Sequence, residues 1–250
     1  MSVQNGSKLN QLILNWPKGA VYTTEWMVEQ GFSRSLINKY KKSRWLSSIV
    51  RGAYTLPGDN VDWTGGLFAV QRQLKLNIHA GGKTALQLKG LAHYISPGIK
   101  KIYLFGVTKQ KLPAWFKNFD WGVEVDYTMT NLFSKDIGLS DYDYGNFTIK
   151  ISSAERAIME TLYLIPQKQT FDESSLLMEH LLTLRPDLIC ELLESATSIK
   201  MKRLFLYLAE KNNLPWLDQL DLSKVDTGSG KRVIIPGGTL NNKYGITVPK

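Results

Sequence analysis

The order of local patterns in the first 57 residues restricts the fold more than any other feature of this sequence. A short helical pattern opens at Thr23 or Thr24 and ends at Gly31, because glycine suits the left-handed residue that follows a helix. A second helical pattern covers about residues 34–43 and follows Ser33, whose hydroxyl can accept a hydrogen bond from the first turn. A short helix, a turn containing glycine and a second helix together predict a helix-turn-helix.

A hairpin pattern follows directly. Residues 45–50 and 53–56 are two short runs in which apolar residues change over with polar ones, and the turn Arg51-Gly52 separates them. Two such runs predict a pair of antiparallel strands. After a helix-turn-helix, the hairpin is interpreted as a wing, with Arg51 at its tip within reach of a phosphate or the minor groove. We therefore predict a winged helix-turn-helix domain over residues 1–57.

The second predicted helix carries a polar, basic face. Its apolar side is formed by Leu36, Ile37 and Tyr40, and the remaining positions hold Arg34, Ser35, Asn38, Lys39, Lys41 and Lys42. Arg34 can pair bidentately with guanine and Asn38 with adenine. Ser35 suits a base edge or a phosphate, and the three lysines suit phosphates, which fix register without reading sequence. These six residues and Arg51 are the candidate DNA-binding residues.

The charge of the chain is concentrated in this first segment. Residues 1–57 hold eight Lys and Arg against two Glu, so 8 − 2 gives +6 of the total net charge of +9. Such asymmetry favours a polyanionic partner for the segment. A basic face that is merely solvated carries the same charge, so the decision between the two depends on the local pattern.

From residue 61 the pattern changes to alternating helices and strands. Strand-like runs and helical patterns follow one another, at about residues 62–74, 101–105, 123–128, 147–151, 155–164, 172–182, 186–196, 200–211 and 231–235. This order predicts an α+β or mixed α/β domain over residues 61–250, with a helical second half. The turn cluster at residues 57–60 is the predicted boundary. Asp141 and Asp143 are predicted to lie in a loop.

One motif in the larger domain resembles part of a nucleotide-binding site. Gly82-Lys83-Thr84 matches the end of a phosphate-binding P-loop, but Asn77 stands where that motif requires its first glycine. Without that glycine the backbone cradle for the phosphates is not specified. The glycines are better explained as a turn that leads into a helix, and we expect no bound cofactor.

The remaining reactive residue types do not form a recognisable site. Glu155 is explained as the partner of Ser152 in a capping box at a helix start. The single cysteine, Cys190, lies in an apolar helical pattern and is predicted to be a buried thiol. The three histidines are far apart and lack the spacing of metal ligands: His79, His93 and His180. We therefore expect no metal site and no catalytic residues.

Two adjacent cations near the end of the chain form a separate candidate contact. Lys231 and Arg232 follow the glycine-rich stretch 226–230. They are predicted to make a second contact, with nucleic acid or with a partner protein. The alternative is an ordinary loop leading into an edge strand, whose charges discourage aggregation.

The sequence also restricts where the protein works. It has no apolar run of about 18 residues that could cross a membrane and no apolar leader. With one cysteine it can form no disulfide within the chain. We expect a cytoplasmic protein with no membrane partner.

Several segments resemble the AbiEi family, the antitoxins of type IV toxin–antitoxin systems. The resemblance extends over essentially the whole chain and includes residues 16–19, 51–54, 79–85, 102–106, 112–116, 151–158, 200–205 and 228–233. It implies an N-terminal winged helix-turn-helix that represses its own operon by binding promoter repeats. It also implies a larger domain that counters the cognate toxin, a nucleotidyltransferase called AbiEii. The family's positively charged DNA-facing surface agrees with Arg34, Lys39, Lys42 and Arg51.

Three functions follow as hypotheses. The first is an autorepressor that binds operator DNA and acts as an antitoxin. The second is a protein-interaction module, in which the helix-turn-helix docks a protein partner in place of DNA. The third is an enzyme, such as a nuclease or a nucleotide-dependent transferase, that uses the helix-turn-helix for targeting, although no cluster of ligands or catalytic residues supports it.

Overall fold

The computed structural model describes residues 2–92, 98–134 and 136–249. His93 therefore lies outside the described residues. The chain forms two compact units: Met1–His79 with Lys109–Glu124 and Asp141–Lys150, and Ala80–Thr108 with Val125–Ser140 and Ile151–Lys250. The predicted boundary at residues 57–60 lies inside the first unit, so the division into domains at that position stays a prediction.

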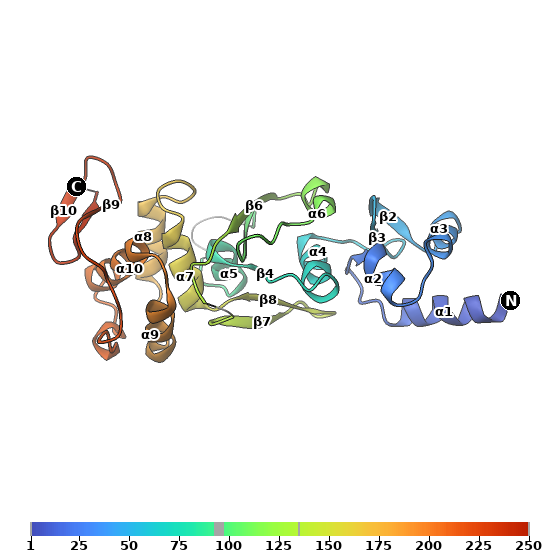
Figure 1. The fold of residues 1–250 in the computed structure, drawn as a ribbon, viewed down its shortest axis with the longest axis horizontal. Helices are drawn as coiled ribbons and strands as arrows, with labels where there is room; N and C mark the ends of the chain where they lie inside the picture. The colour runs from blue at the N-terminus through green and yellow to red at the C-terminus, as the bar shows by residue number, and fades with distance from the viewer. Residues whose placement is uncertain (1, 93–97, 135, 250) are drawn as a thin grey trace. The chain divides into compact units, whose positions relative to one another are not determined.

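The first unit opens with three helices and a small sheet (Figure 1). Its elements, in chain order, are α1 (Ser2–Leu14), β1 (Tyr22–Thr23), α2 (Thr24–Glu29), α3 (Arg34–Lys42), β2 (Ser47–Val50) and β3 (Ala53–Thr55). The strands form an antiparallel sheet in the order β1-β3-β2, with Tyr54 of β3 opposite Tyr22 on one side and Ser48 on the other. The predicted order of helix, turn, helix and hairpin is confirmed.

Three further helical segments belong to the same unit. They are α4 (Trp63–Phe68), the π-helical segment η1 (Ala69–Gln73) and α6 (Ala114–Asn118). Asp62 caps α4, because its carboxylate accepts a hydrogen bond from the backbone N–H of Thr64 at 2.8 Å. Gly65 of α4 lies so close to the loop before β1 that a Cβ atom there would stand 1.9 Å from the carbonyl oxygen of Gly19.

A five-stranded sheet has the order β6-β5-β4-β8-β7. Its strands are β4 (Ile78–Ala80), β5 (Lys101–Gly106), β6 (Glu124–Met129), β7 (Leu139–Asp143) and β8 (Thr148–Ser152). Strands β4 and β8 run parallel, with Ala80 opposite Ile151. The predicted mixed α/β class is confirmed.

The second unit is mainly helical after β8. Its helices are α5 (Gly82–Leu88), α7 (Ala154–Tyr163), α8 (Phe171–Glu179), α9 (Pro186–Ser195), α10 (Ile199–Lys211) and the 3₁₀ turn η2 (Leu217–Gln219). Helix α7 packs against α5, α8, α9 and α10 (Figure 1). The chain ends in a small sheet of order β10-β11-β9, formed by Thr239–Asn241, Ile246–Val248 and Arg232–Val233.

Three local predictions are wrong. Asp141 and Asp143 lie in the edge strand β7 and not in a loop. Both are exposed, whereas the alternate residues of the strand, Ser140 and Tyr142, are half-buried. Cys190 is only half-buried, because α9 turns Ile189, Leu192 and Leu193 toward the core instead.

The third wrong prediction concerns the start of α7. Ser153, not Ser152, is the N-cap, since its hydroxyl accepts from the backbone N–H of Arg156. Ser152 ends β8, and its buried hydroxyl donates to the carboxylate of Glu160 at 2.7 Å. The carboxylate of Glu155 accepts hydrogen bonds from Arg185, so its main role is an ion pair.

No helix within the described residues is long and apolar enough to span a bilayer.

Candidate nucleic-acid interface

Side-chain caps fix the two helices of the helix-turn-helix. The hydroxyl of Thr23 accepts from the backbone N–H of Trp26 at the start of α2. The hydroxyl of Ser33 accepts from the backbone N–H of Leu36 at 3.2 Å at the start of α3. Gly31 has a φ of +85°, the left-handed conformation that turns the chain between the helices. Both predicted caps and the glycine turn are confirmed.

Helix α3 is anchored by its apolar side. Ile37 and Tyr40 are buried, and Leu36 is half-buried. Burial raises the pKa of the Tyr40 hydroxyl above its ordinary value. The hydroxyl therefore stays neutral at physiological pH and adds no negative charge beneath the basic face of α3.

The wing is tied to the start of α2. The backbone N–H of Thr24 donates to the carbonyl oxygen of Gly52 at 2.9 Å, and Gly52 has a φ of +88° in the turn between β2 and β3. Arg51, the other turn residue, is exposed. This hydrogen bond fixes the tip of the hairpin relative to the helix-turn-helix.

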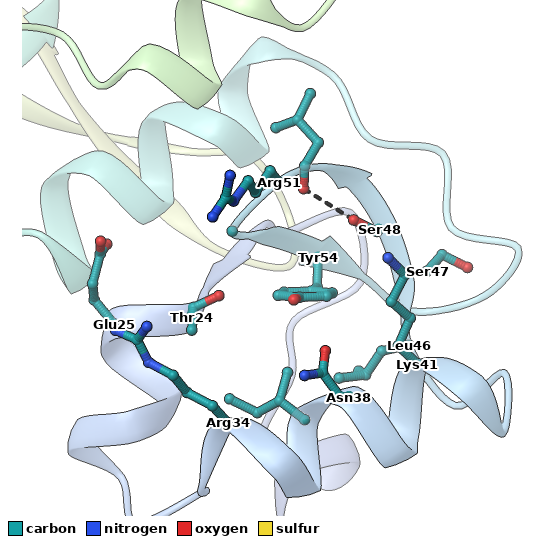
Figure 2. Close-up of a pocket in the computed structure, with 13 residues that line it drawn as sticks. Thr24, Glu25, Arg34, Asn38, Lys41, Leu46, Ser47, Ser48, Arg51 and Tyr54 are labelled. Carbon is teal, nitrogen blue, oxygen red and sulfur yellow. Dashed lines mark hydrogen bonds between the residues drawn. The ribbon is translucent and has the colours of Figure 1, made fainter.

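One groove lies between α3 and the wing (Figure 2). Four of the seven predicted DNA-binding residues line it: Arg34, Asn38 and Lys41 from α3 and Arg51 from the wing turn. In Figure 2 the Tyr54 ring lies in the middle of the groove, with Arg51 toward the wing and Asn38 toward the helix. The groove therefore combines side chains from two elements, the helix α3 and the tip of the wing.

The groove is basic and its cations are available. It holds Arg34, Lys41 and Arg51 against one acidic residue, Glu25. Among the residues that the structure describes, the side chains of these three cations take part in no hydrogen bond or ion pair. Cations without a partner in the protein are free to bind DNA phosphates, which releases counterions from the DNA.

The other three predicted residues, Ser35, Lys39 and Lys42, are exposed on α3 but do not line the groove. The hydroxyl of Ser35 lies 2.9 Å from that of Ser33, so it already has one hydrogen-bond partner. Helix α3 thus presents two stripes at i, i+4 and i+7 spacing, one lining the groove and one beside it.

The sequence did not single out several residues that line the groove, among them Glu25, Ser48 and Tyr54. Ser48 and Tyr54 are directly opposite each other in the hairpin and so share a face, but this follows from the strand register, which the sequence pattern does not give. Nothing in the local pattern distinguished Glu25 from an ordinary acidic residue in a first helical turn.

Lys231 and Arg232 lie on a loop and edge strand that a buried cation holds. Both are exposed, and among the described strands β9 pairs only with β11. The guanidinium of Arg203 on α10 donates to the carbonyl oxygens of Thr227 at 2.7 Å and Gly228 at 2.8 Å, and also to those of Gly230 and Gly245. The loop that carries the two cations is therefore ordered.

The glycine turn before α5 is occupied by groups of the protein. The backbone N–H of Gly82 donates to the buried carboxylate of Glu160 at 2.9 Å, and Lys83 pairs with Glu173. The hydroxyl of Thr84 accepts from the backbone N–H of Tyr103 at 2.7 Å. The groups that would contact a phosphate in a P-loop are thus engaged within the second unit.

No cluster of three metal-ligating side chains occurs in residues 2–92, 98–134 and 136–249.

Comparisons with known proteins agree with this geometry. Residues 5–97 match the N-terminal domain of the AbiEi antitoxin, a transcriptional regulator, and residues 99–249 match the model described as transcriptional regulator, AbiEi antitoxin, type IV toxin–antitoxin system. The chain resembles the crystal structure of the RV2827C protein from Mycobacterium tuberculosis, with a TM-score of 0.60 and 15% identity over 98% of this chain and 91% of that one. No curated protein matches the chain. Since the family models extend over nearly all of its length, the chain belongs to the AbiEi family of transcriptional regulators and antitoxins of type IV toxin–antitoxin systems.

Proposed function

We propose that the groove between α3 and the wing binds operator DNA in the promoter of the protein's own operon and represses that operon. The observation that carries the proposal is the convergence of Arg34, Asn38 and Lys41 with Arg51 in one basic groove. A recognition helix enters the major groove with its N-terminal residues toward the bases, and a wing tip then meets the backbone or the minor groove.

The candidate residues divide into those that contact bases and those that contact phosphates. Arg34 in the first turn of α3 pairs with a guanine, and Asn38 one turn later pairs with an adenine, because their side chains match those bases bidentately. Lys41 and Arg51 bind phosphates on either side. Lys39, Lys42 and Ser35 contact phosphates that flank the groove, which orients the helix without reading sequence.

The antitoxin half of the proposal concerns the second unit. We propose that it counters a nucleotidyltransferase toxin encoded beside this gene, as the family resemblance implies. Lys231 and Arg232 form a second contact, with nucleic acid or with that toxin, and their exposure on an ordered loop supports this role. Co-purification with the neighbouring gene product tests direct contact, and Lys231→Glu with Arg232→Glu tests these two residues. Unchanged co-purification and unchanged DNA affinity in that double variant would remove the tail from the proposal.

Fluorescence anisotropy tests the DNA-binding half. The protein is titrated onto a duplex of its own promoter and onto a scrambled duplex, across a salt series. If about six phosphates are neutralised, log affinity falls against log salt with a slope of roughly −5. Equal, weak binding to both duplexes contradicts the repressor. A shallow slope together with capture of a protein partner favours the protein-docking module.

Two variants test the assignment of α3. Arg34→Ala is expected to weaken promoter binding by roughly 1–3 kcal/mol and to relax preference at one base pair. Lys42→Ala is expected to weaken binding to both duplexes about equally, since a phosphate contact carries no sequence information. If both variants bind like the parent protein, α3 is not the recognition helix.

A further inference from the structure

The connection between α3 and the wing contains a residue in an unfavourable backbone conformation. Arg44 has a φ of +59°, in the left-handed region where glycine is preferred. Its backbone N–H donates to the carbonyl oxygen of Lys41, and that of Trp45 donates to the carbonyl oxygen of Tyr40 at 2.9 Å. This is the pattern that normally ends a helix with glycine. A glycine at position 44 would make the same hydrogen bonds without strain.

The guanidinium of Arg44 makes no polar contact with a described residue that would offset this strain. The side chain is exposed, and the guanidinium has no hydrogen bond or ion pair with any other residue that the structure describes. Backbone strain of this kind is found at functional sites, but Lys75 has a similar left-handed φ. The position of Arg44, between the recognition helix and the wing, is what distinguishes it.

The residue after Arg44, Trp45, is unusually exposed for a tryptophan of this chain. Its side chain is 51% exposed, whereas the other six tryptophans are buried or half-buried. The next residue, Leu46, is buried and lines the groove. The indole N–H of Trp45 can only donate a hydrogen bond, and it has no partner among the described residues. A cation and an indole donor without a partner among the described residues are thus adjacent in sequence, one residue after the end of α3 at Lys42.

We propose that Arg44 and Trp45 form a phosphate-binding site at the C-terminal end of the recognition helix. The site rests on the proposed function, since its ligand is the phosphodiester backbone of the DNA that α3 reads. When the N-terminal part of α3 faces the bases, the connection to the wing meets the strand that borders the major groove. There the guanidinium of Arg44 and the indole N–H of Trp45 donate to phosphate oxygens. An arginine at this position supplies a cation that the glycine preferred by the backbone would lack.

The test uses Arg44→Gly, which removes the cation and relieves the strain together. Lys75→Gly is the matched control, because Lys75 is also an exposed cation with a left-handed φ, of +53°, and lies outside the groove. Both variants are expected to melt at or above the temperature of the parent protein. Arg44→Gly is expected to weaken binding to the promoter and the scrambled duplex alike, by about 5-fold, and to reduce the salt slope by about 0.9. Lys75→Gly is expected to leave affinity and slope unchanged.

Trp45→Phe tests the indole separately, since it keeps an aromatic ring and removes the N–H donor. We expect it to weaken binding to both duplexes by about 10-fold or more, as the loss of one hydrogen bond to a charged group would. Unchanged binding by Trp45→Phe overturns the part assigned to the indole.

The remaining outcomes separate this inference from the proposed function. If the parent protein prefers its promoter and Arg44→Gly binds as tightly as the parent, only the phosphate site is overturned. If Arg44→Gly melts well below the parent protein, the arginine supports the fold and the argument from strain is wrong. If the parent protein shows no promoter preference and no steep salt dependence, the proposed function fails and the phosphate site fails with it.

Discussion

The side-chain amide of Gln73 holds Thr23 at the start of the helix-turn-helix. Gln73 Oε1 accepts hydrogen bonds from the backbone N–H of Thr23 at 2.9 Å and from its hydroxyl at 3.2 Å, and Gln73 Nε2 donates to the carbonyl oxygen of Val21 at 2.7 Å. All three residues are buried. Because Thr23 also caps α2, a residue of the π-helical segment η1 supports the recognition motif from 50 positions along the chain.

Replacing Gln73 by methionine is expected to destabilise the first unit by about 2–4 kcal/mol. Methionine has a similar length, but it leaves the N–H of Thr23 and the carbonyl of Val21 buried without partners, which costs roughly 1–3 kcal/mol for each group. Urea unfolding followed by tryptophan fluorescence measures the loss. The matched control is Gln30→Met at the exposed end of α2, which is expected to change stability by less than about 0.5 kcal/mol. Equal stabilities of the two variants would contradict the role given to Gln73.

Local signals predicted the helix-turn-helix well because its determinants are local. Caps at Thr23 and Ser33 and the glycine turn at Gly31 each act within a few residues. The two-residue strand β1 escaped prediction, since only its pairing with β3 defines it and two residues cannot show an alternation. The start of α7 failed for a related reason: Ser152 and Ser153 are equivalent in sequence, and a long-range bond to Glu160 engages the first.

The candidate site could be predicted only in part. Arg34, Asn38 and Lys41 have the same helical spacing as Ser35, Lys39 and Lys42, so the sequence offers no reason to prefer either stripe. The position of the wing decides which of them lines the groove. That position depends on strand pairing and on a hydrogen bond between the wing turn and α2, neither of which a helical pattern contains.

Asn38→Ala is expected to relax the preference of the protein for one adenine in its operator. Asn38 is exposed and lines the groove one turn after Arg34. Loss of the bidentate contact is expected to reduce the binding free energy by roughly 1–3 kcal/mol for a duplex with the adenine. For a duplex with another base at that position, the binding free energy is expected to stay the same. Anisotropy on a set of promoter duplexes with single base-pair changes measures this. The control is Asn242→Ala in the C-terminal sheet region, which is exposed and is expected to reproduce the profile of the parent protein. An unchanged base-pair profile for Asn38→Ala would exclude Asn38 as a residue that contacts a base.

Acid is expected to weaken the second unit through Glu155. Burial opposes ionisation of this carboxyl, but hydrogen bonds from the side chain and backbone of Arg185 outweigh it and lower the pKa from 4.5 to about 2. A folded-state pKa below the unfolded value means stability that is present above pH 4.5 and is lost as the pH falls toward 2. Because the side chain of Arg185 is 66% exposed, solvent screening limits the contribution to about 1–2 kcal/mol.

The comparison is between the parent protein and Glu155→Gln, each unfolded by urea at pH 7 and pH 3. The parent protein is expected to lose about 1–2 kcal/mol more than the variant between these pH values. Glutamine keeps the size of the side chain and cannot titrate, so other carboxyl groups contribute equally to both proteins. The same loss in both would show that the ion pair with Arg185 adds nothing to stability.

Arg203→Met is expected to release the loop that carries Lys231 and Arg232. The arginine is buried on α10 and donates to the carbonyl oxygens of Thr227, Gly228, Gly230 and Gly245. Methionine occupies much of the space of the aliphatic part of Arg203 but donates no hydrogen bond. The carbonyl oxygens of the loop then bond to water, and the loop opens more often. Trypsin cleaves after exposed lysine and arginine, and cleavage at Lys231 and Arg232 is expected to become at least about 10-fold faster.

Lys211→Met, on the exposed end of the same helix, controls for the loss of a positive charge from α10 and is expected to be cleaved at the rate of the parent protein. The rest of the second unit should remain folded in Arg203→Met, because α7 still packs against α5, α8, α9 and α10 in that variant. If Arg203→Met resists trypsin as well as the parent protein does, the glycine loop is ordered by its own turns and by pairing of β9 with β11. In that case Arg203 would not be the residue that presents the two cations.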